Sequence, residues 1–109
     1  MAWWQEVGLP NRKAMGVATF TWVLKQRDYI YYTDELKDHL AQHFRLTPEQ
    51  IKATTDNGKA IWPNHVDWQS ANWTTLEYHK QVGAKRNKCY QLTDAGLRRA
   101  KRALEGKPY

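Results

Sequence analysis

LEYHKQVGAKRNKCYQL, residues 76–92, is the stretch that decides the predicted fold of this chain. Two short strand-like runs, Leu76–Lys80 and Lys88–Leu92, flank a polar tip that contains Gly83. Glycine adopts the positive φ angles that tight turns between antiparallel strands require. The stretch therefore predicts a β-hairpin with a cationic tip.

Helical periodicity precedes this hairpin. Residues 12–27 place apolar side chains at helical spacing and predict a first helix. Residues 29–32, which are aromatic and β-branched, predict a short strand. Thr33 is the expected cap of a second helix over residues 34–44.

A third helical region leads directly into the hairpin. The run Thr47-Pro48-Glu49-Gln50 has the pattern of a capping box and predicts the start of a short helix. The next helix is expected over residues 59–79, with Pro63 in its first turn. Its apolar face is predicted to consist of Trp62, Val66, Gln69, Trp73 and Leu76.

The hairpin is followed by a closing helix over residues 94–104, capped by Thr93 or Asp94. We expect its inward face to carry Leu97, Ala100 and Leu104, and its outward face to carry Arg98, Arg99, Lys101 and Arg102. At the other end of the chain, the apolar Trp3 and Trp4 predict that the N-terminal arm docks against the body.

This order of elements predicts a mainly α (α+β) fold, a winged helix-turn-helix. It has a three-helix core, a two-stranded β-wing and a C-terminal helix. We expect one domain over residues 1–109, because domains usually contain about 100–150 residues. Its expected parts are an arm (1–10), a helical trio (12–79) with a strand at 29–32, a wing (76–92) and a closing helix (94–104).

Positive charge is concentrated near the C-terminal end. The chain has 17 Lys and Arg against 11 Asp and Glu, a net charge of +6. Residues 1–78 hold eight basic and nine acidic side chains, whereas residues 79–109 hold nine basic and two acidic ones. A concentrated basic surface favours polyanions, with nucleic acid first. The alternative is a solvated basic surface that only keeps the protein soluble.

Several classes of function are not supported by the sequence. With 109 residues the chain is far shorter than a (β/α)₈ barrel, which needs roughly 250. Cys89 is the only cysteine, so a reducing, cytoplasmic compartment is expected, and no apolar run is long enough for a membrane helix. His39 and His43 have the i, i+4 spacing of a zinc pair but lack further ligands. We expect no metal, no cofactor and no enzymatic activity.

Residues 61–104 resemble the winged-helix domain at the N-terminus of Mrr-type restriction endonucleases. In that family a helix with a Val-x-Trp motif and a large apolar residue five places later leads into the hairpin. A strand, a Leu/Ile-Thr pair and a glycine that opens the last helix complete the pattern. The matching residues here are Val66, Trp68, Trp73, Leu92, Thr93 and Gly96.

This sequence departs from the family pattern at three points. Leu76 and Glu77 stand where the family usually has an Ala-Gly pair at the helix exit. The helix has no Lys or Arg between Lys59 and Lys80, although the family helix usually carries one. The nuclease domain that usually follows is missing from this sequence, so the resemblance implies DNA binding and not cleavage.

Together these observations predict double-stranded DNA recognition by helix 59–79, with the basic wing on the phosphate backbone. We expect the backbone contacts to come from Lys59, Lys80, Lys85, Arg86, Lys88, Arg98, Arg99 and Arg102. We expect the base contacts to come from Asn64, His65, Asp67 and Asn72. Trp68 is expected to pack under the wing or against the first helix, with stacking on DNA or on a partner as the alternative.

The functional role left open by the sequence is a targeting module of a restriction system or a small transcription regulator. The alternative, a protein-interaction or dimerisation module on the same fold, is favoured by the cation-free helix and the tryptophan-rich arm. Expected partners are double-stranded DNA, a second copy of the chain, or a nuclease or other protein, with no membrane partner.

Overall fold

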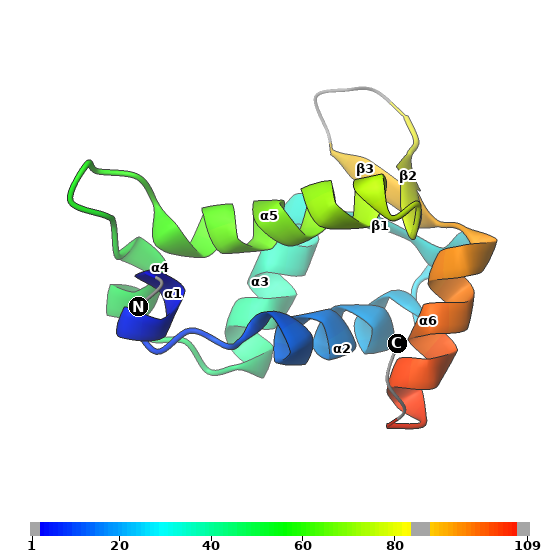
Figure 1. Cartoon of the computed structure of the whole chain (residues 1–109), viewed down its shortest axis with the longest axis horizontal. Helices are drawn as coiled ribbons and strands as arrows, with labels where there is room; N and C mark the ends of the chain where they lie inside the picture. Colours follow the sequence, from blue (N-terminus) through cyan, green and yellow to red (C-terminus); the bar gives the residue numbers. More distant parts are fainter. Residues whose placement is uncertain (1–2, 84–87, 107–109) are drawn as a thin grey trace.

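The computed structural model describes residues 3–83 and 88–106 (Figure 1). The helices are α1 (Trp3–Glu6), α2 (Arg12–Val23), α3 (Thr33–His43), α4 (Pro48–Lys52), α5 (Ile61–Thr75) and α6 (Asp94–Leu104). The strands are β1 (Ile30–Tyr32), β2 (His79–Gln81) and β3 (Cys89–Leu92), and a 3₁₀ turn covers Arg27–Tyr29. The fold is thus mainly helical with a small sheet, as the sequence predicts.

Helix α2 begins where the sequence predicts but ends four residues earlier. The side chain of Asn11 accepts a hydrogen bond from the backbone N–H of Ala14 at 2.7 Å, which fixes the start. After Val23 the chain turns, and Asp28 and Tyr29 adopt positive φ angles of 56° and 58°. Gln26, before them, is already extended, with φ −86° and ψ 147°, so the predicted extension of the helix to residue 27 is wrong.

Helices α3 and α4 lie close to the predicted positions, but only α4 begins with the predicted cap. Thr33 does not cap α3: it is the first helical residue, and its hydroxyl donates to the carbonyl oxygen of Lys88 at 2.8 Å. In α4 the predicted capping box is confirmed, because the Thr47 side chain accepts from the Gln50 N–H and the Gln50 side chain accepts from the Thr47 N–H.

The sheet has three strands in the order β1-β3-β2, all antiparallel. Tyr31 pairs with Tyr90, and Lys80 pairs with Gln91 on the other side of β3. The predicted two-stranded wing is therefore incomplete, because β1, 47 residues away from β2 in sequence, covers the second edge of β3. The hairpin strands are also shorter than predicted, because a turn covers residues 76–78. Helix α5 covers residues 61–75, so the predicted helix over residues 59–79 is too long at both ends.

The core lies between α2, α3, α5 and α6, with the sheet at one end of it (Figure 1). Phe20 of α2 and Trp73 of α5 stack at its centre, with ring centroids 4.1 Å apart. The N-terminal arm docks as expected for Trp4, which packs against this core. Among the described residues, no helix combines the length and apolar character needed to cross a membrane.

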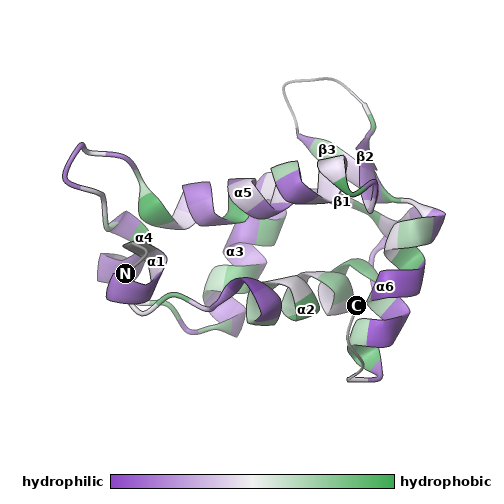
Figure 2. Ribbon diagram, viewed as in Figure 1, coloured by the Kyte–Doolittle hydropathy of each residue, from purple (hydrophilic) through white to green (hydrophobic). Residues whose placement is uncertain are grey.

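Helix α6 has the predicted bounds but a different inward face. Ala100 and Ala103 are buried, whereas Leu104 is 56% exposed, so its predicted inward position is wrong. Small side chains on the buried face allow α6 to pack closely against α2. Figure 2 shows the resulting mixture of hydrophilic and hydrophobic residues along this helix.

Candidate nucleic-acid interface

The orientation of α5 decides which of its residues can reach a ligand. Trp62, Val66 and Trp73 are buried on the core side, as predicted. Gln69 is buried with them, and its side-chain amide donates to the hydroxyl of Thr19 at 2.9 Å. The opposite face of α5 is exposed and bears Asn64, Trp68, Ala71 and Thr75. Leu76, predicted on the core side, is also exposed, because it lies beyond the last helical residue.

The four predicted base-contacting residues do not lie in equivalent positions. Asn64 is exposed, and Asn72 is half-buried. The carboxylate of Asp67 forms an ion pair with the ammonium group of Lys37 from α3, with 3.0 Å between oxygen and nitrogen. Because this pair neutralises Asp67, the exposed side of α5 carries less negative charge than its sequence suggests.

His65 is a correction to the predicted interface, because its side chain is buried. Its Nε2–H donates to the carbonyl oxygen of Pro10 at 2.9 Å, and its ring stacks on Trp4 at a centroid distance of 5.3 Å. Burial lowers the pKa of this imidazole, opposed by the hydrogen bond to Pro10. The N-terminal arm, whose position cannot be inferred from the periodicity of α5, covers this residue.

The predicted backbone-contacting cations form an exposed set over two elements and a loop. Lys80 and Lys88 lie on the hairpin, Arg98 and Arg102 on α6, and Lys59 just before α5; all five are exposed. Arg99 is half-buried, with its guanidinium carbon 5.7 Å from the ring centroid of Tyr78. None of these six forms an ion pair with another described residue. Lys85 and Arg86 lie outside the described residues.

A buried histidine connects the hairpin to α5. His79, the first residue of β2, is 2% exposed. Its Nε2–H donates to the carbonyl oxygen of Ser70 at 2.9 Å. The hydroxyl oxygen of Thr74 lies at the same distance, 2.9 Å, from Nε2. Since Nε2 carries the proton, Nδ1 accepts a hydrogen bond from the hydroxyl of Tyr31.

The surroundings of His79 keep it neutral. Burial lowers its pKa to about 4, against the opposing effect of the hydrogen bond to Ser70. Its ring also stacks on Tyr90 of β3 at a centroid distance of 4.0 Å. Through this one side chain, β1, β2, β3 and α5 are held in a fixed relative position. His79 was not among the predicted site residues, although its inward position on a strand was the available signal.

The junction between the sheet and α6 is tightly built. Thr93 caps α6, since its hydroxyl oxygen accepts from the N–H of Gly96 at 3.1 Å. A Cβ atom on residue 96 would lie 1.9 Å from the carbonyl oxygen of Tyr78. Only glycine fits this position, so both the threonine and the glycine of the predicted motif have a structural reason.

Comparison with known families identifies this arrangement. The family model of the Mrr N-terminal domain matches residues 23–102. The chain belongs to this family. No curated protein and no solved structure matches it. The matched range includes the sheet, α5 and the motif residues from Val66 to Gly96, in agreement with the resemblance predicted from the sequence.

The helix exit of this Mrr N-terminal domain explains one departure from the family pattern. The N–H of Glu77 donates to the carbonyl of Thr74 at 3.1 Å, and the N–H of Tyr78 donates to that of Trp73 at 2.9 Å. This pair of bonds is a Schellman motif, which places the residue after the C-cap in the left-handed region. Glu77 has a φ of 59° and therefore adopts the conformation that glycine favours.

In this Mrr N-terminal domain, Trp68 of α5 contacts a cation from another helix, whereas α5 itself has no Lys or Arg. The guanidinium carbon of Arg12 lies 3.6 Å from the centroid of its ring. The predicted packing of Trp68 against the first helix is thus realised by the first residue of α2, while the side chain remains 40% exposed. Arg12 was not among the predicted site residues, because nothing in its local sequence links it to residue 68.

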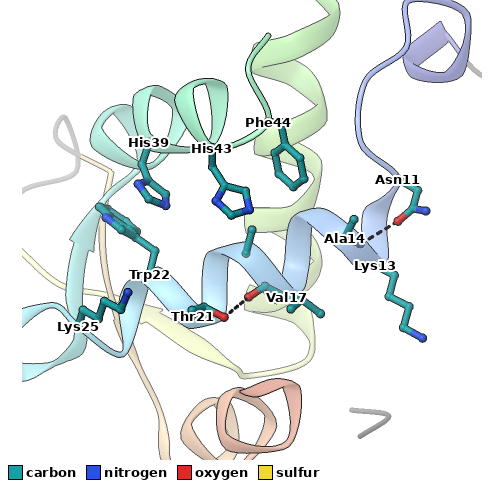
Figure 3. A pocket seen from close by; sticks show the side chains of 11 residues that line it. Asn11, Lys13, Ala14, Val17, Thr21, Trp22, Lys25, His39, His43 and Phe44 are labelled. Carbon is teal, nitrogen blue, oxygen red and sulfur yellow. Dashed lines mark hydrogen bonds between the residues drawn. The ribbon is translucent and has the colours of Figure 1, made fainter. Parts of the chain in front are cut away.

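The Mrr N-terminal domain also has a cleft of about 570 Å³ between α2 and α3 (Figure 3). His39 and His43 lie over it from α3, and His39 stacks on Trp22 at a centroid distance of 5.2 Å. Burial, with neighbouring His43 and Lys25, lowers the pKa of His39. Within residues 3–83 and 88–106, no group of three His, Cys, Asp or Glu side chains could hold a metal ion. None of the predicted DNA-contacting residues lines this cleft.

Proposed function

We propose that this Mrr N-terminal domain binds double-stranded DNA as a winged helix, with α5 as the recognition helix and the β2–β3 hairpin as the wing. The strand order β1-β3-β2 and the direct passage from α5 into the hairpin support this arrangement. In such a fold the helix lies in the major groove while adjacent cations contact phosphates.

The observation that carries the proposal is the state of the hairpin lysines. Strands β2 and β3 pair antiparallel, and Lys80 and Lys88, in and beside these strands, have no carboxylate partner among the described residues. Their charge is therefore available to a polyanion. The basic excess of residues 79–109 extends the same positive field over α6, where Arg98 and Arg102 are exposed.

Helix α5 contributes neutral hydrogen-bonding groups to this proposed surface. Asn64 is exposed near its first turn, and a side-chain amide can pair with the edge of adenine. The Asp67–Lys37 pair reduces the repulsion between the helix and a phosphate backbone. Sequence discrimination would then come from a few polar groups, while affinity would come from the surrounding cations.

The role that we propose is targeting: the domain brings a restriction-type nuclease, carried elsewhere, to DNA. The domain itself would bind duplex DNA without cleaving it. We therefore expect a duplex incubated with the chain and Mg²⁺ to stay intact under conditions in which it is bound.

Fluorescence anisotropy tests the proposal. A labelled 20-base-pair duplex is titrated with the full chain at several NaCl concentrations. Each phosphate contact should add about −0.9 to the slope of log affinity against log salt concentration. Matched plain, methylated and single-stranded probes define the preferred DNA form. Failure to bind any duplex at low salt, or salt-independent binding, would overturn the proposal.

A further inference from the structure

Arg12 and Trp68 form a contact that brings charge to the exposed face of α5. The guanidinium carbon of Arg12 is 3.6 Å from the ring centroid of Trp68. Arg12 is exposed, and it forms no ion pair with another described residue. Because α5 has no Lys or Arg of its own, this guanidinium supplies a positive charge directly over the helix.

The pair borders a surface concavity of about 310 Å³ at the start of α5. Trp4, Lys59 and Asn64 line the same concavity. The lining has two cations, several neutral polar groups and no carboxylate. The chemistry of this surface therefore favours an anion.

The two indole rings decide which part of a nucleic acid fits. Trp4 already stacks on His65, and Trp68 already stacks on Arg12. A nucleobase placed on either of these occupied faces would have to displace a stacked group. A phosphate would not, because a guanidinium that stacks on an aromatic ring keeps its N–H donors in its own plane, where two of them can bind phosphate oxygens.

We infer that Arg12 binds a backbone phosphate beside α5, with Lys59 as a second cation and Trp68 as the residue that positions the guanidinium. This inference rests on the proposed DNA binding and adds a site to it. It also accounts for how a helix without Lys or Arg can lie against DNA. In this arrangement the phosphate lies in the concavity, and Trp68 positions the guanidinium of Arg12.

The experiment compares Arg12→Gln with Arg27→Gln in the anisotropy titration over a series of NaCl concentrations. Arg27 lies beyond the opposite end of α2, so Arg27→Gln removes the same charge at a place away from the concavity. Arg12→Gln should weaken binding to all duplexes and reduce the magnitude of the salt slope by about 0.9. Arg12→Lys, which keeps the charge but loses the paired donors, should retain the slope and lose part of the affinity. Arg27→Gln should leave both unchanged.

A double-mutant cycle tests the role of Trp68. Trp68→Ala should weaken binding in the wild-type background but have no further effect in Arg12→Gln, because its contribution passes through the arginine. Trp68→Phe should remain close to wild type, and thermal melts by circular dichroism check that each variant is folded. An equal loss from Trp68→Ala in both backgrounds would mean that the ring itself contacts DNA, and would overturn the inference.

The outcomes separate this site from the proposed function. If the wild-type chain binds no duplex, DNA binding itself fails. If the wild type binds and Arg12→Gln has the wild-type affinity and salt slope, the phosphate site is wrong while DNA binding stands.

Discussion

Gly96 lies so close to Tyr78 that the Tyr78 carbonyl oxygen is 1.9 Å from the place where a Cβ on residue 96 would be. This approach brings the first turn of α6 against the start of the hairpin. Thr93 strengthens the same junction, because its N–H donates to the Tyr78 carbonyl at 3.0 Å. The orientation of α6 relative to the hairpin is thus set by backbone contacts rather than by large side chains.

Gly96→Ala should therefore be strongly destabilising. The methyl group meets backbone, which cannot move without breaking the Thr93 bond, so we expect a loss of about 3 kcal/mol or more in the free energy of unfolding. Urea denaturation followed by circular dichroism measures it. Gly58→Ala is the control: Gly58 also resists substitution through its φ of 79°, but no atom lies within 4 Å of the new Cβ. Equal losses in both variants would contradict the steric explanation.

Glu77→Gly should stabilise the domain by about 1 kcal/mol, because glycine adopts positive φ without the steric cost that a Cβ imposes. Glu77→Ala separates this effect from the loss of charge, since alanine keeps the Cβ. We expect the midpoint of urea denaturation to rise for the glycine variant only. A similar rise for alanine would show that the carboxylate, and not the backbone conformation, limits stability at this position.

Stability should fall as the pH decreases from about 6.5 to about 4, because the pKa of His79 is about 4 in the folded state and 6.5 without the protein environment. In this range the unfolded chain binds a proton that the folded chain does not, so protonation favours unfolding. A difference of this size corresponds to about 3 kcal/mol for this one group.

Two measurements check the histidine prediction. The imidazole Cε1–H resonance of His79 should titrate with a midpoint far below that of an exposed histidine, in an NMR titration. The free energy of unfolding, measured at several pH values, should decrease most steeply below pH 6.5. An NMR midpoint above 6 for His79 would contradict the assigned neutral state.

The double substitution of Lys80→Gln and Lys88→Gln should reduce the magnitude of the salt slope of duplex binding by about 1.8, the equivalent of two phosphate contacts. The loss of affinity should be similar for all sequences, because phosphate contacts do not read bases. Lys52→Gln, in α4 at the opposite end of α5, is the control, which removes one charge away from the hairpin (Figure 1). An unchanged slope in the double variant would remove the hairpin from the DNA-binding surface.

Local signals in the sequence predicted a large part of this fold. The Thr47–Gln50 capping box, the Thr93 cap and the bounds of α6 depend on residues within a few positions of one another, and all three are present. The hairpin also depends on near neighbours, and β2 and β3 pair antiparallel as predicted. These features could be predicted because the interactions that stabilise them are local.

The features that were missed depend on contacts between distant segments. The third strand, β1, pairs with β3 across about sixty residues, and a three-residue strand gives no sequence signal of its partner. The burial of His65 requires the N-terminal arm, whose docking site α5 alone does not reveal. The same holds for Arg12 and Trp68, which meet only after α2 and α5 pack. The buried face of α6 is formed by Gly96, Ala100 and Ala103, and Leu104 lies beside this face and is exposed.

The bond between Thr33 and Lys88 has a mechanical consequence. Both the N–H and the hydroxyl of Thr33 donate to the Lys88 carbonyl, so the outgoing strand of the hairpin is fastened to the first turn of α3. The start of β3 therefore cannot move away from α3 without the loss of both bonds. A load that reaches β3 would pass directly into the helical body.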